Sequence, residues 1–264
     1  MNIIKVENLA CGYGSHQVLK SIYFEINEPE FVCVVGPNGV GKSTLIRALT
    51  GLLKPTDGQI SLMGRRLDEY SQKEVARLIG YVPVLHADFN VMTVLETVLV
   101  GRYLHQKWRT SQKDIDVAYN ALRAMEIEEL ADRKFNQLSA GQRQKVSLAR
   151  GLVQEPTILM LDEPTANLDI RHQVYVSAFL KELSDKTGMT VFTVSHDLNL
   201  AAKYADRIIL MEPPGRIYRI GKPEDIITRD NIRHVYGVDC EVTDDNGKPH
   251  VVLQDVLEVS IERV

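Results

Sequence analysis

Residues 36–44 of the chain read Gly36-Pro37-Asn38-Gly39-Val40-Gly41-Lys42-Ser43-Thr44. An apolar run, Phe31–Val35, precedes this stretch, and Leu45–Leu49 after it is typical of a helix. Strand, glycine-rich turn and helix are the context in which a G-x-x-x-x-G-K-[ST] pattern binds phosphate. Glycines let backbone N–H groups turn inward around phosphate oxygens, and the helix N-terminus adds partial positive charge. The stretch predicts a nucleoside triphosphate site, with Lys42 on the β- and γ-phosphates and Ser43 on Mg²⁺.

Composition is that of an ordinary globular protein. The 264 residues are 44% hydrophobic and 25% charged, enough for one large α/β domain with a substantial core. A net charge of −4 gives no electrostatic reason to expect nucleic acid as a partner. The three cysteines, Cys11, Cys33 and Cys240, lack metal-ligand spacing, and their odd number favours a reducing compartment. We find neither a signal peptide nor an apolar run of the ~20 residues that a bilayer requires.

Strand-like patterns alternate with helical ones along the chain. Residues 2–9, 18–26 and 60–63 predict a small antiparallel sheet, and residues 79–82 predict a buried strand. From about Thr93 to Leu152 the spacing of apolar residues is helical, and it begins with a capping box in which Glu96 follows Thr93 by three residues.

The second half of the chain predicts a parallel sheet. Strands are expected at residues 157–161 and 190–194, with an amphipathic helix at about 171–184 between them, and this order implies a crossover connection. The tail from Gly237 reads as a hairpin that turns through Asp244–Gly247.

Two acids follow the predicted strand at residues 157–161. A carboxylate at the position of Asp162 holds the Mg²⁺ of a P-loop nucleotide, usually through water. The neighbouring Glu163 projects differently, and we expect it to polarise the attacking water as a general base.

A five-residue stretch before these acids resembles a known family. Leu138-Ser139-Ala140-Gly141-Gln142 is similar to the signature sequence of ABC-transporter ATPases, Leu-Ser-Gly-Gly-Gln, and it precedes the two acids by the family's usual interval. The resemblance covers nearly the whole chain in the family's order. It implies a D-loop at residues 166–169, a switch histidine at His196 and an aromatic contact with adenine from Tyr13. The nucleotide-binding residues that it implies are Tyr13, residues 36–44, Ser139, Ala140, Gly141, Gln142 and Asp169; the catalytic residues are Glu163 and His196; the Mg²⁺ ligands are Ser43 and Asp162.

The resemblance also implies an assembly. In the family, two ATPases pack head-to-tail, so that Ser139 and the N–H of Gly141 would complete the γ-phosphate site of a second copy. Two transmembrane permease subunits would use the clamp motion of this dimer, and an extracytoplasmic substrate-binding protein would act on them indirectly. The chain would then be peripheral, on the cytoplasmic face of the cell membrane.

The implied fold is an α/β P-loop NTPase core with a mainly parallel sheet, an antiparallel β-subdomain and an inserted helical subdomain. We predict a single ABC ATPase domain over residues 1–264. Its nucleotide-binding core would comprise residues 1–85 and 156–225, its helical subdomain residues 86–155, and its C-terminal extension residues 226–264.

Two positions depart from the family pattern. Ala140 replaces a signature glycine and should cost little, because alanine suits a helix start. Val84 stands where the family has a glutamine that touches Mg²⁺ or the attacking water, and valine has no atom able to do so. His86 is close in sequence, but we do not expect it to substitute, because loop histidines are usually just exposed.

Local features further resemble the subfamily that imports iron–siderophores, haem or cobalamin. These are residues 98–103, 168–173 and 233–238, although helix faces and capping turns explain each of them equally well. Two alternatives stay open at this point. One is a soluble non-transport ABC ATPase, and the other is a weakly hydrolysing regulatory nucleotide-binding module, which Val84 favours.

Replacing Val84 by glutamine should raise ATP hydrolysis, or its dependence on the membrane partner, with little change in ATP affinity. The reason is that a contact made in the transition state changes turnover, whereas one made equally in the ground state changes binding. Steady-state turnover and equilibrium ATP binding check this. Equal turnover and equal transport for the two forms would show that Val84 is only an apolar plug.

Overall fold

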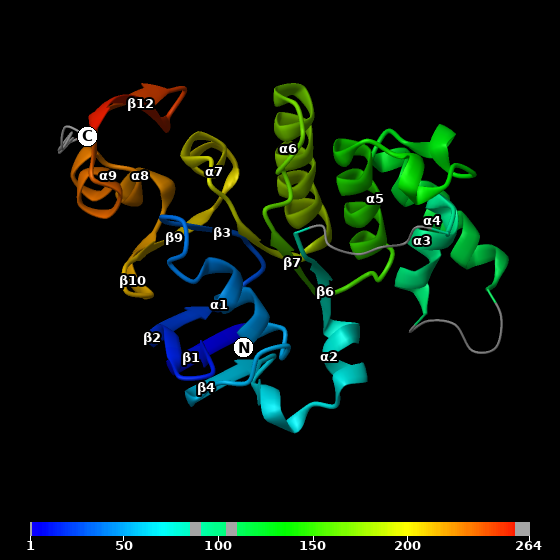
Figure 1. Cartoon of the computed structure of the whole chain (residues 1–264), viewed down its shortest axis with the longest axis horizontal. Coiled ribbons are helices and arrows are strands. Elements are labelled where there is room, and N and C mark those ends of the chain that lie inside the picture. The colour runs from blue at the N-terminus through cyan, green and yellow to red at the C-terminus, as the bar shows by residue number, and fades with distance from the viewer. Residues whose placement is uncertain (1, 85–90, 104–109, 257–264) are drawn as a thin grey trace, which may run out of the picture. The chain divides into compact units, whose positions relative to one another are not determined.

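The computed structural model describes residues 2–84, 91–103 and 110–256, and they group into two compact units (Figure 1). Unit 1 comprises residues 1–65 and 194–264, and unit 2 comprises residues 66–193. The division of the chain into core, helical subdomain and extension that the sequence predicts stays a prediction.

Unit 1 contains the predicted antiparallel sheet. Strand β1 pairs antiparallel with β2 on one side and β4 on the other, and Ile4 faces Ile26 and Leu62 in the two registers. All three of these side chains are fully buried, because one face of the sheet packs on the core. The strands of this sheet are β1 (Ile4–Tyr13), β2 (His16–Ile26), β4 (Asp57–Leu62) and β5 (Arg65–Arg66).

Unit 1 also holds a strand layer with helices. Strand β3 runs parallel to β9, and β9 pairs antiparallel with β10. The elements are β3 (Phe31–Val35), α1 (Lys42–Leu49), α7 (Leu198–Tyr204), β9 (Arg207–Glu212), β10 (Arg216–Gly221), α8 (Pro223–Ile226), α9 (Arg229–Tyr236), β11 (Val238–Asp245) and β12 (Lys248–Val256). The predicted C-terminal hairpin is confirmed. Its two-residue turn is Asn246-Gly247, both at positive φ, as a type I′ turn requires.

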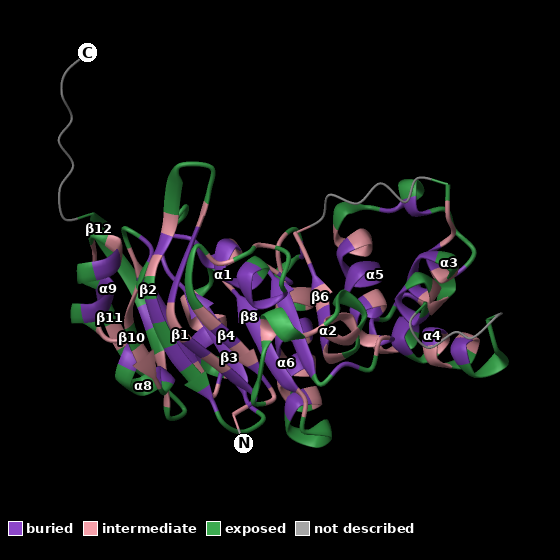
Figure 2. Cartoon of the chain, turned by 90° about the horizontal axis from the view of Figure 1, so that it is seen from below, coloured by how far each residue is buried: buried purple, intermediate pink, exposed green. Residues whose placement is uncertain are grey.

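Unit 2 combines parallel strands with the predicted helical region. Strands β6 and β7 are parallel, in the order β8-β7-β6. Every residue of β3, β7 and β8 is buried, which is typical of strands covered on both faces (Figure 2). The elements are α2 (Gln72–Leu78), β6 (Ile79–Val82), α3 (Val94–Leu99), α4 (Gln112–Ala124), α5 (Ala140–Leu152), β7 (Ile158–Asp162), α6 (Ile170–Thr187) and β8 (Thr190–Val194), with 3₁₀ turns at Leu67–Glu69, Val100–Arg102, Glu128–Leu130 and Phe135–Gln137.

Capping boxes start four helices of unit 2, α2, α3, α4 and α5. The predicted box of Thr93 and Glu96 is present: the Glu96 carboxylate accepts from the Thr93 N–H at 2.7 Å, and the Thr93 hydroxyl accepts from the Glu96 N–H at 3.2 Å. Helices α2, α4 and α5 begin in the same way at Ser71, Ser111 and Ser139. Each box satisfies N–H groups that a helix start leaves without partners.

A buried arginine connects the helices of unit 2. Arg102 Nε donates to Asp114 Oδ1 at 3.0 Å, and its Nη1 donates to the Val153 carbonyl at 2.8 Å and to Glu155 at 2.7 Å. The side chains of Arg102 and Asp114 are only 4% and 7% exposed. Hydrogen bonds from Ser111, together with Arg102, lower the pKa of Asp114 to about 2. Arg102 thus connects α4, through Asp114, with the end of α5, through the Val153 carbonyl.

All three cysteines are free thiols in the interior. Burial raises the pKa of Cys11 to about 11 and that of Cys33 to about 12, and it also raises the pKa of Cys240.

Among the helices that the structure describes, none is both long and apolar enough to cross a membrane.

Arg102→Met should destabilise unit 2 by about 3–5 kcal/mol, because it leaves the buried Asp114 carboxylate without its cation. Urea unfolding at pH 7, followed by circular dichroism, measures the loss. Because the pKa of Asp114 is depressed in the folded state, the contribution of this carboxylate is present above about pH 4 and is lost as the pH falls toward 2.

The matched control is Arg123→Met. Arg123 also pairs with a carboxylate, Glu128, but its side chain is 62% exposed, so the change should cost less than about 1 kcal/mol. Equal losses for the two variants would contradict the structural importance of the buried pair.

Candidate active site

The glycine-rich stretch forms a tight loop between β3 and α1 (Figure 1). A Cβ at Gly36 would lie 2.6 Å from the Met211 carbonyl oxygen, so the loop leaves β3 at a point where only glycine fits. Gly41 caps α1 with φ 107°, in the left-handed region. Inside the loop, Lys42 Nζ donates to the carbonyls of Gly36 at 2.7 Å and Pro37 at 2.9 Å. The loop therefore wraps around the lysine ammonium.

The residues of this loop fit a triphosphate. Lys42 is 5% exposed, so water screens the charge of its ammonium group only weakly. Helix α1 has no acidic residue in its first turn, so none there competes with phosphate for the positive end of the helix. Asn38 and Gly39, in the middle of the loop, are exposed, and Ser43 is half-buried. Val40 and Thr44 are buried and anchor it from below.

Two further predicted residues lie in unit 1 with the loop. The Ser195 N–H donates to the Val34 carbonyl at 3.1 Å, so the segment that carries His196 is bonded to the strand that leads into the loop. His196 itself is exposed. The Tyr13 hydroxyl accepts from Arg47 of α1 at 3.2 Å, and its ring is 45% exposed. Tyr13 is thus bonded to the helix that follows the phosphate loop, and the segment that carries His196 is bonded to the strand that precedes it.

The two acids lie in unit 2 at the end of β7. Asp162, the last residue of the strand, is 2% exposed. Glu163 has φ 52°, a left-handed conformation that costs a non-glycine residue about 1–3 kcal/mol. The Glu163 carbonyl accepts from the Ala166 N–H at 3.1 Å, which closes the turn. Asp162 is buried whereas Glu163 is half-buried; the different projection of their two carboxylates stays a prediction.

The signature residues begin α5 in the same unit. Ser139 is the N-cap: its hydroxyl accepts from the Gln142 N–H at 3.2 Å, and its own N–H donates to the Gln142 side chain at 3.0 Å. Ser139 and Ala140 are exposed, so this helix start is accessible. A Cβ at Gly141 would lie 3.3 Å from the Asn167 carbonyl oxygen, so the signature packs closely on the predicted D-loop.

One buried side chain joins the signature helix to the acidic strand. Gln144 is 1% exposed, and its Nε2 donates to the Pro164 carbonyl at 3.1 Å, directly after Glu163. Asp169, at the end of the predicted D-loop, caps α6 and contacts the His172 ring at 2.8 Å. The His172 backbone N–H and then its side chain hold the pKa of Asp169 below its usual range. Signature, D-loop and acids therefore form one connected set.

Val84 follows β6 and is half-buried, with only an aliphatic side chain to offer. His86 lies outside the described residues. The described part of the chain contains no group of three or more His, Cys, Asp or Glu side chains placed to hold a metal ion. The hydroxyl of Ser43 and the carboxylate of Asp162 are both oxygen ligands, the type that Mg²⁺ prefers.

Comparison with known proteins decides the family. The family model described as ABC transporter matches residues 19–166, more than half of the chain. The chain belongs to the ABC transporter family. The Escherichia coli (strain K12) ferric enterobactin transport ATP-binding protein FepC is 40% identical over 255 residues, which cover 94% of this chain and 93% of that protein. This ABC protein is an ATPase, and the predicted α/β fold class is confirmed.

Solved structures agree with this assignment. A metal-chelate type ABC transporter in an inward-facing conformation matches with a TM-score of 0.81 and 29% identity, over 96% of this chain and 97% of that one. A dimeric ATP-binding cassette bound to ADP and Pi in a post-hydrolysis state matches with a TM-score of 0.74 and 31% identity, over 83% of this chain and 98% of that one. ATP as the nucleotide of this ABC protein follows from the family.

The structure explains two of the subfamily-like stretches. In residues 98–103, Gly101 is required because a Cβ would lie 2.3 Å from the Arg150 carbonyl oxygen, and Arg102 makes the buried pair described above. In residues 168–173, Asp169 caps a helix. Sequence reasoning did not identify Gln144 or Arg47 as supports of the site, because both act through contacts that lie far away in sequence or depend on the fold.

Glu163→Gln should reduce ATP hydrolysis at least 100-fold while ATP still binds, because the amide cannot accept the proton of the attacking water.

Lys42→Ala should act at the binding step and weaken ATP affinity, because it removes a positive charge from the phosphates. Equilibrium binding and phosphate release separate the two variants. Hydrolysis at the parental rate by the glutamine variant, or unchanged affinity of the alanine variant, would refute the respective role.

Proposed function

We propose that this ABC ATPase energises the import of an iron chelate through partner membrane subunits. The observation that carries the proposal is the match to the ferric enterobactin ATP-binding protein along nearly the full length of both chains. The metal-chelate type transporter matches over nearly the whole chain as well. This coverage favours an importer subunit over a non-transport ATPase, and it extends to the C-terminal hairpin region that the family model does not include.

The proposed working form is a head-to-tail dimer of two copies. The exposed start of α5, with the Ser139 hydroxyl and the Gly141 N–H, is suited to bind the γ-phosphate of ATP on the partner copy. The dimeric cassette with ADP and Pi supports this arrangement. Each copy would supply the phosphate loop of one site and the signature of the other, as two-fold symmetry requires.

Mg²⁺ is the proposed metal of each site. Ser43 and Asp162 would hold it together with phosphate oxygens and water, and the bound ion would neutralise the charge on the β- and γ-phosphates. The chain's own residues do the rest: Lys42 binds the phosphates, Glu163 accepts a proton from water, and His196 contacts the γ-phosphate. Tyr13 would stack on adenine, and Asp169 would act at the dimer interface.

The proposed partners are a second copy of this chain, two transmembrane permease subunits and, through them, an extracytoplasmic substrate-binding protein. The dimer would lie on the cytoplasmic face of the membrane as a peripheral subunit. Nucleic acid is not among the proposed partners.

A Glu163→Gln allele in the organism that encodes the chain should lower uptake of ⁵⁵Fe presented as ferric siderophore at least tenfold. Ser139→Arg should have the same effect although the isolated chain still binds ATP, because the signature acts on the partner copy's nucleotide. Uptake of haem and of labelled cobalamin is measured in parallel. If ferric-chelate uptake is unchanged and haem or cobalamin uptake is lost, the transported substrate is haem or cobalamin and not the proposed iron chelate. If uptake of all three is unchanged, the importer role is overturned.

A further inference from the structure

The described part of the C-terminal extension, residues 226–256, shares one hydrophobic core with the elements on either side of the active-site loops. Cys33 and Val35 of β3, which leads into the phosphate loop, are part of this core. So are Ala201 and Ala202 of α7, the helix that follows His196. The extension contributes Ile226, Ile227, Ile232, Val235, Cys240 and Val251. Displacement of the extension would therefore shift the phosphate loop, which follows β3, and the His196 segment, which precedes α7.

Tyr236, the last residue of α9, brings a polar group to the phosphate loop. Its hydroxyl oxygen is buried, and no hydrogen-bond partner of normal geometry is present among the described residues. Burial raises the pKa of Tyr236, while the backbone N–H of Gly36 acts in the opposite direction. Gly36 is the residue whose carbonyl accepts from Lys42. The Tyr236 phenol thus lies beside the Gly36 N–H, while the Gly36 carbonyl binds the Lys42 ammonium.

That placement matters when a triphosphate binds. The phosphates compete with the loop carbonyls for the Lys42 ammonium, and the loop then loses the bonds that hold Gly36 and Pro37. A phenol oxygen can accept a hydrogen bond from an N–H. A buried phenol without a partner costs free energy, which a new hydrogen bond would recover. A small shift of Gly36 toward Tyr236 would satisfy the hydroxyl and hold the loop in place.

Asn199 makes a second connection, three residues after His196. Its Nδ2 donates to the Val251 carbonyl at 3.2 Å, and its Oδ1 accepts from the Val251 N–H at 2.7 Å. The amide thereby pairs with both backbone groups of one residue of β12. Asn199 also belongs to the first turn of α7, which Asp197 caps. The hairpin is thus bonded directly to the segment that carries His196.

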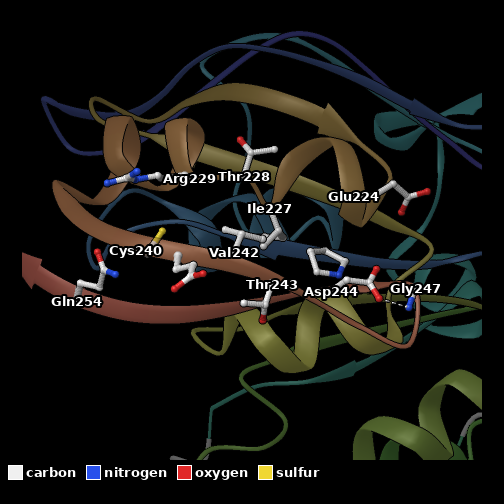
Figure 3. A pocket seen from close by; sticks show the side chains of 12 residues that line it. Glu224, Ile227, Thr228, Arg229, Cys240, Val242, Thr243, Asp244, Gly247 and Gln254 are labelled. Atoms are coloured by element: carbon white, nitrogen blue, oxygen red, sulfur yellow. Dashed lines mark hydrogen bonds between the residues drawn. The ribbon is translucent and has the colours of Figure 1, made fainter.

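One side of the hairpin borders an open pocket. A pocket of about 660 Å³ lies between its strands and the start of α8 and α9, lined by Glu224, Ile227, Thr228, Val242 and Thr243 among others (Figure 3). The pocket is open, and the polar side chains that line it do not converge on one point (Figure 3). The pocket marks incomplete packing on this side, and β12 is held by its pairing with β11, by the Asn199–Val251 bonds and by the buried Val251 side chain.

We propose that the C-terminal extension positions the two loops that act on the γ-phosphate, with Tyr236 holding Gly36 and Asn199 holding the His196 segment. The proposal rests on the ATPase site described above and gives residues 233–238, which the family motifs do not account for, a role in that site. Tyr236 and Asn199 are positioning residues, because each acts through a loop and neither touches the nucleotide.

The first test is Tyr236→Phe in a Glu163→Gln background, where ATP binding is measured without hydrolysis. The variant should bind ATP about five- to tenfold more weakly, the effect of one hydrogen bond formed only in the nucleotide-bound loop. Without nucleotide its melting temperature should be unchanged or higher, because a buried hydroxyl lacking a partner is removed. Tyr218→Phe is the matched control: Tyr218 packs on the same core but stacks on His234 at 4.5 Å.

The second test is Asn199→Ala in the otherwise unchanged chain. It should lower kcat about tenfold and leave the KM for ATP unchanged, because the His196 segment acts after binding. Asn231→Ala is the control, since its Nδ2 donates to the Ile226 carbonyl at 2.9 Å within the extension and contacts neither loop. This control should lower the melting temperature with kcat unchanged.

The role of the extension and the ATPase site can fail separately in these measurements. Parental ATP affinity for Tyr236→Phe, or an equal loss for Tyr218→Phe, would overturn the role of Tyr236. Parental kcat for Asn199→Ala, or an equal loss for Asn231→Ala, would reduce the extension to a structural element. Absence of ATP binding by the Glu163→Gln parent would instead refute the ATPase site, with no bearing on the extension.

Discussion

A buried ammonium group is the constraint on which the active site depends. Lys42 Nζ lies in a loop that excludes most solvent, so its positive charge needs oxygen partners, and the carbonyls of Gly36 and Pro37 supply two of them. Those carbonyls can turn inward only because Gly36 has no side chain where it passes Met211. Nucleotide phosphates offer the same lysine a stronger, charged partner. The loop is therefore arranged around an ammonium group whose carbonyl partners can be replaced by the phosphate oxygens of the nucleotide.

The functional side chains are placed by strands that have no function of their own. Gly36 follows β3 directly, Glu163 follows β7, and Ser195-His196 follows β8, and all three strands are buried along their whole length. Buried strands are rigid because their side chains are packed on both faces, and the residues just beyond such a strand are held in place by it. Among them, Glu163 is half-buried and His196 is exposed. This is the general location of ligand sites in open α/β sheets.

The sequence allowed prediction of local features that short-range chemistry determines. The phosphate loop, the capping box at Thr93, the hairpin turn at Asn246-Gly247 and the strands of the antiparallel sheet each depend on residues a few positions apart. Strands β9 and β10 and helices α8 and α9 were not predicted, because their apolar patterns are short and their pairing is with distant elements. The strained φ of Glu163, the burial of Asp114 and the contacts of Tyr236 depend on tertiary packing that no local spacing reports.

The burial of all three thiols has a practical consequence. Nucleophilic sulfur is the thiolate, and with pKa values of about 11 and 12 Cys11 and Cys33 are almost entirely protonated at neutral pH, besides being inaccessible. A cysteine introduced at an exposed position would thus be the site that a maleimide or spin-label reagent modifies, with the native thiols left in place. The folded chain is in effect a cysteine-free background, suited to attaching probes that follow loop and subunit movements during turnover.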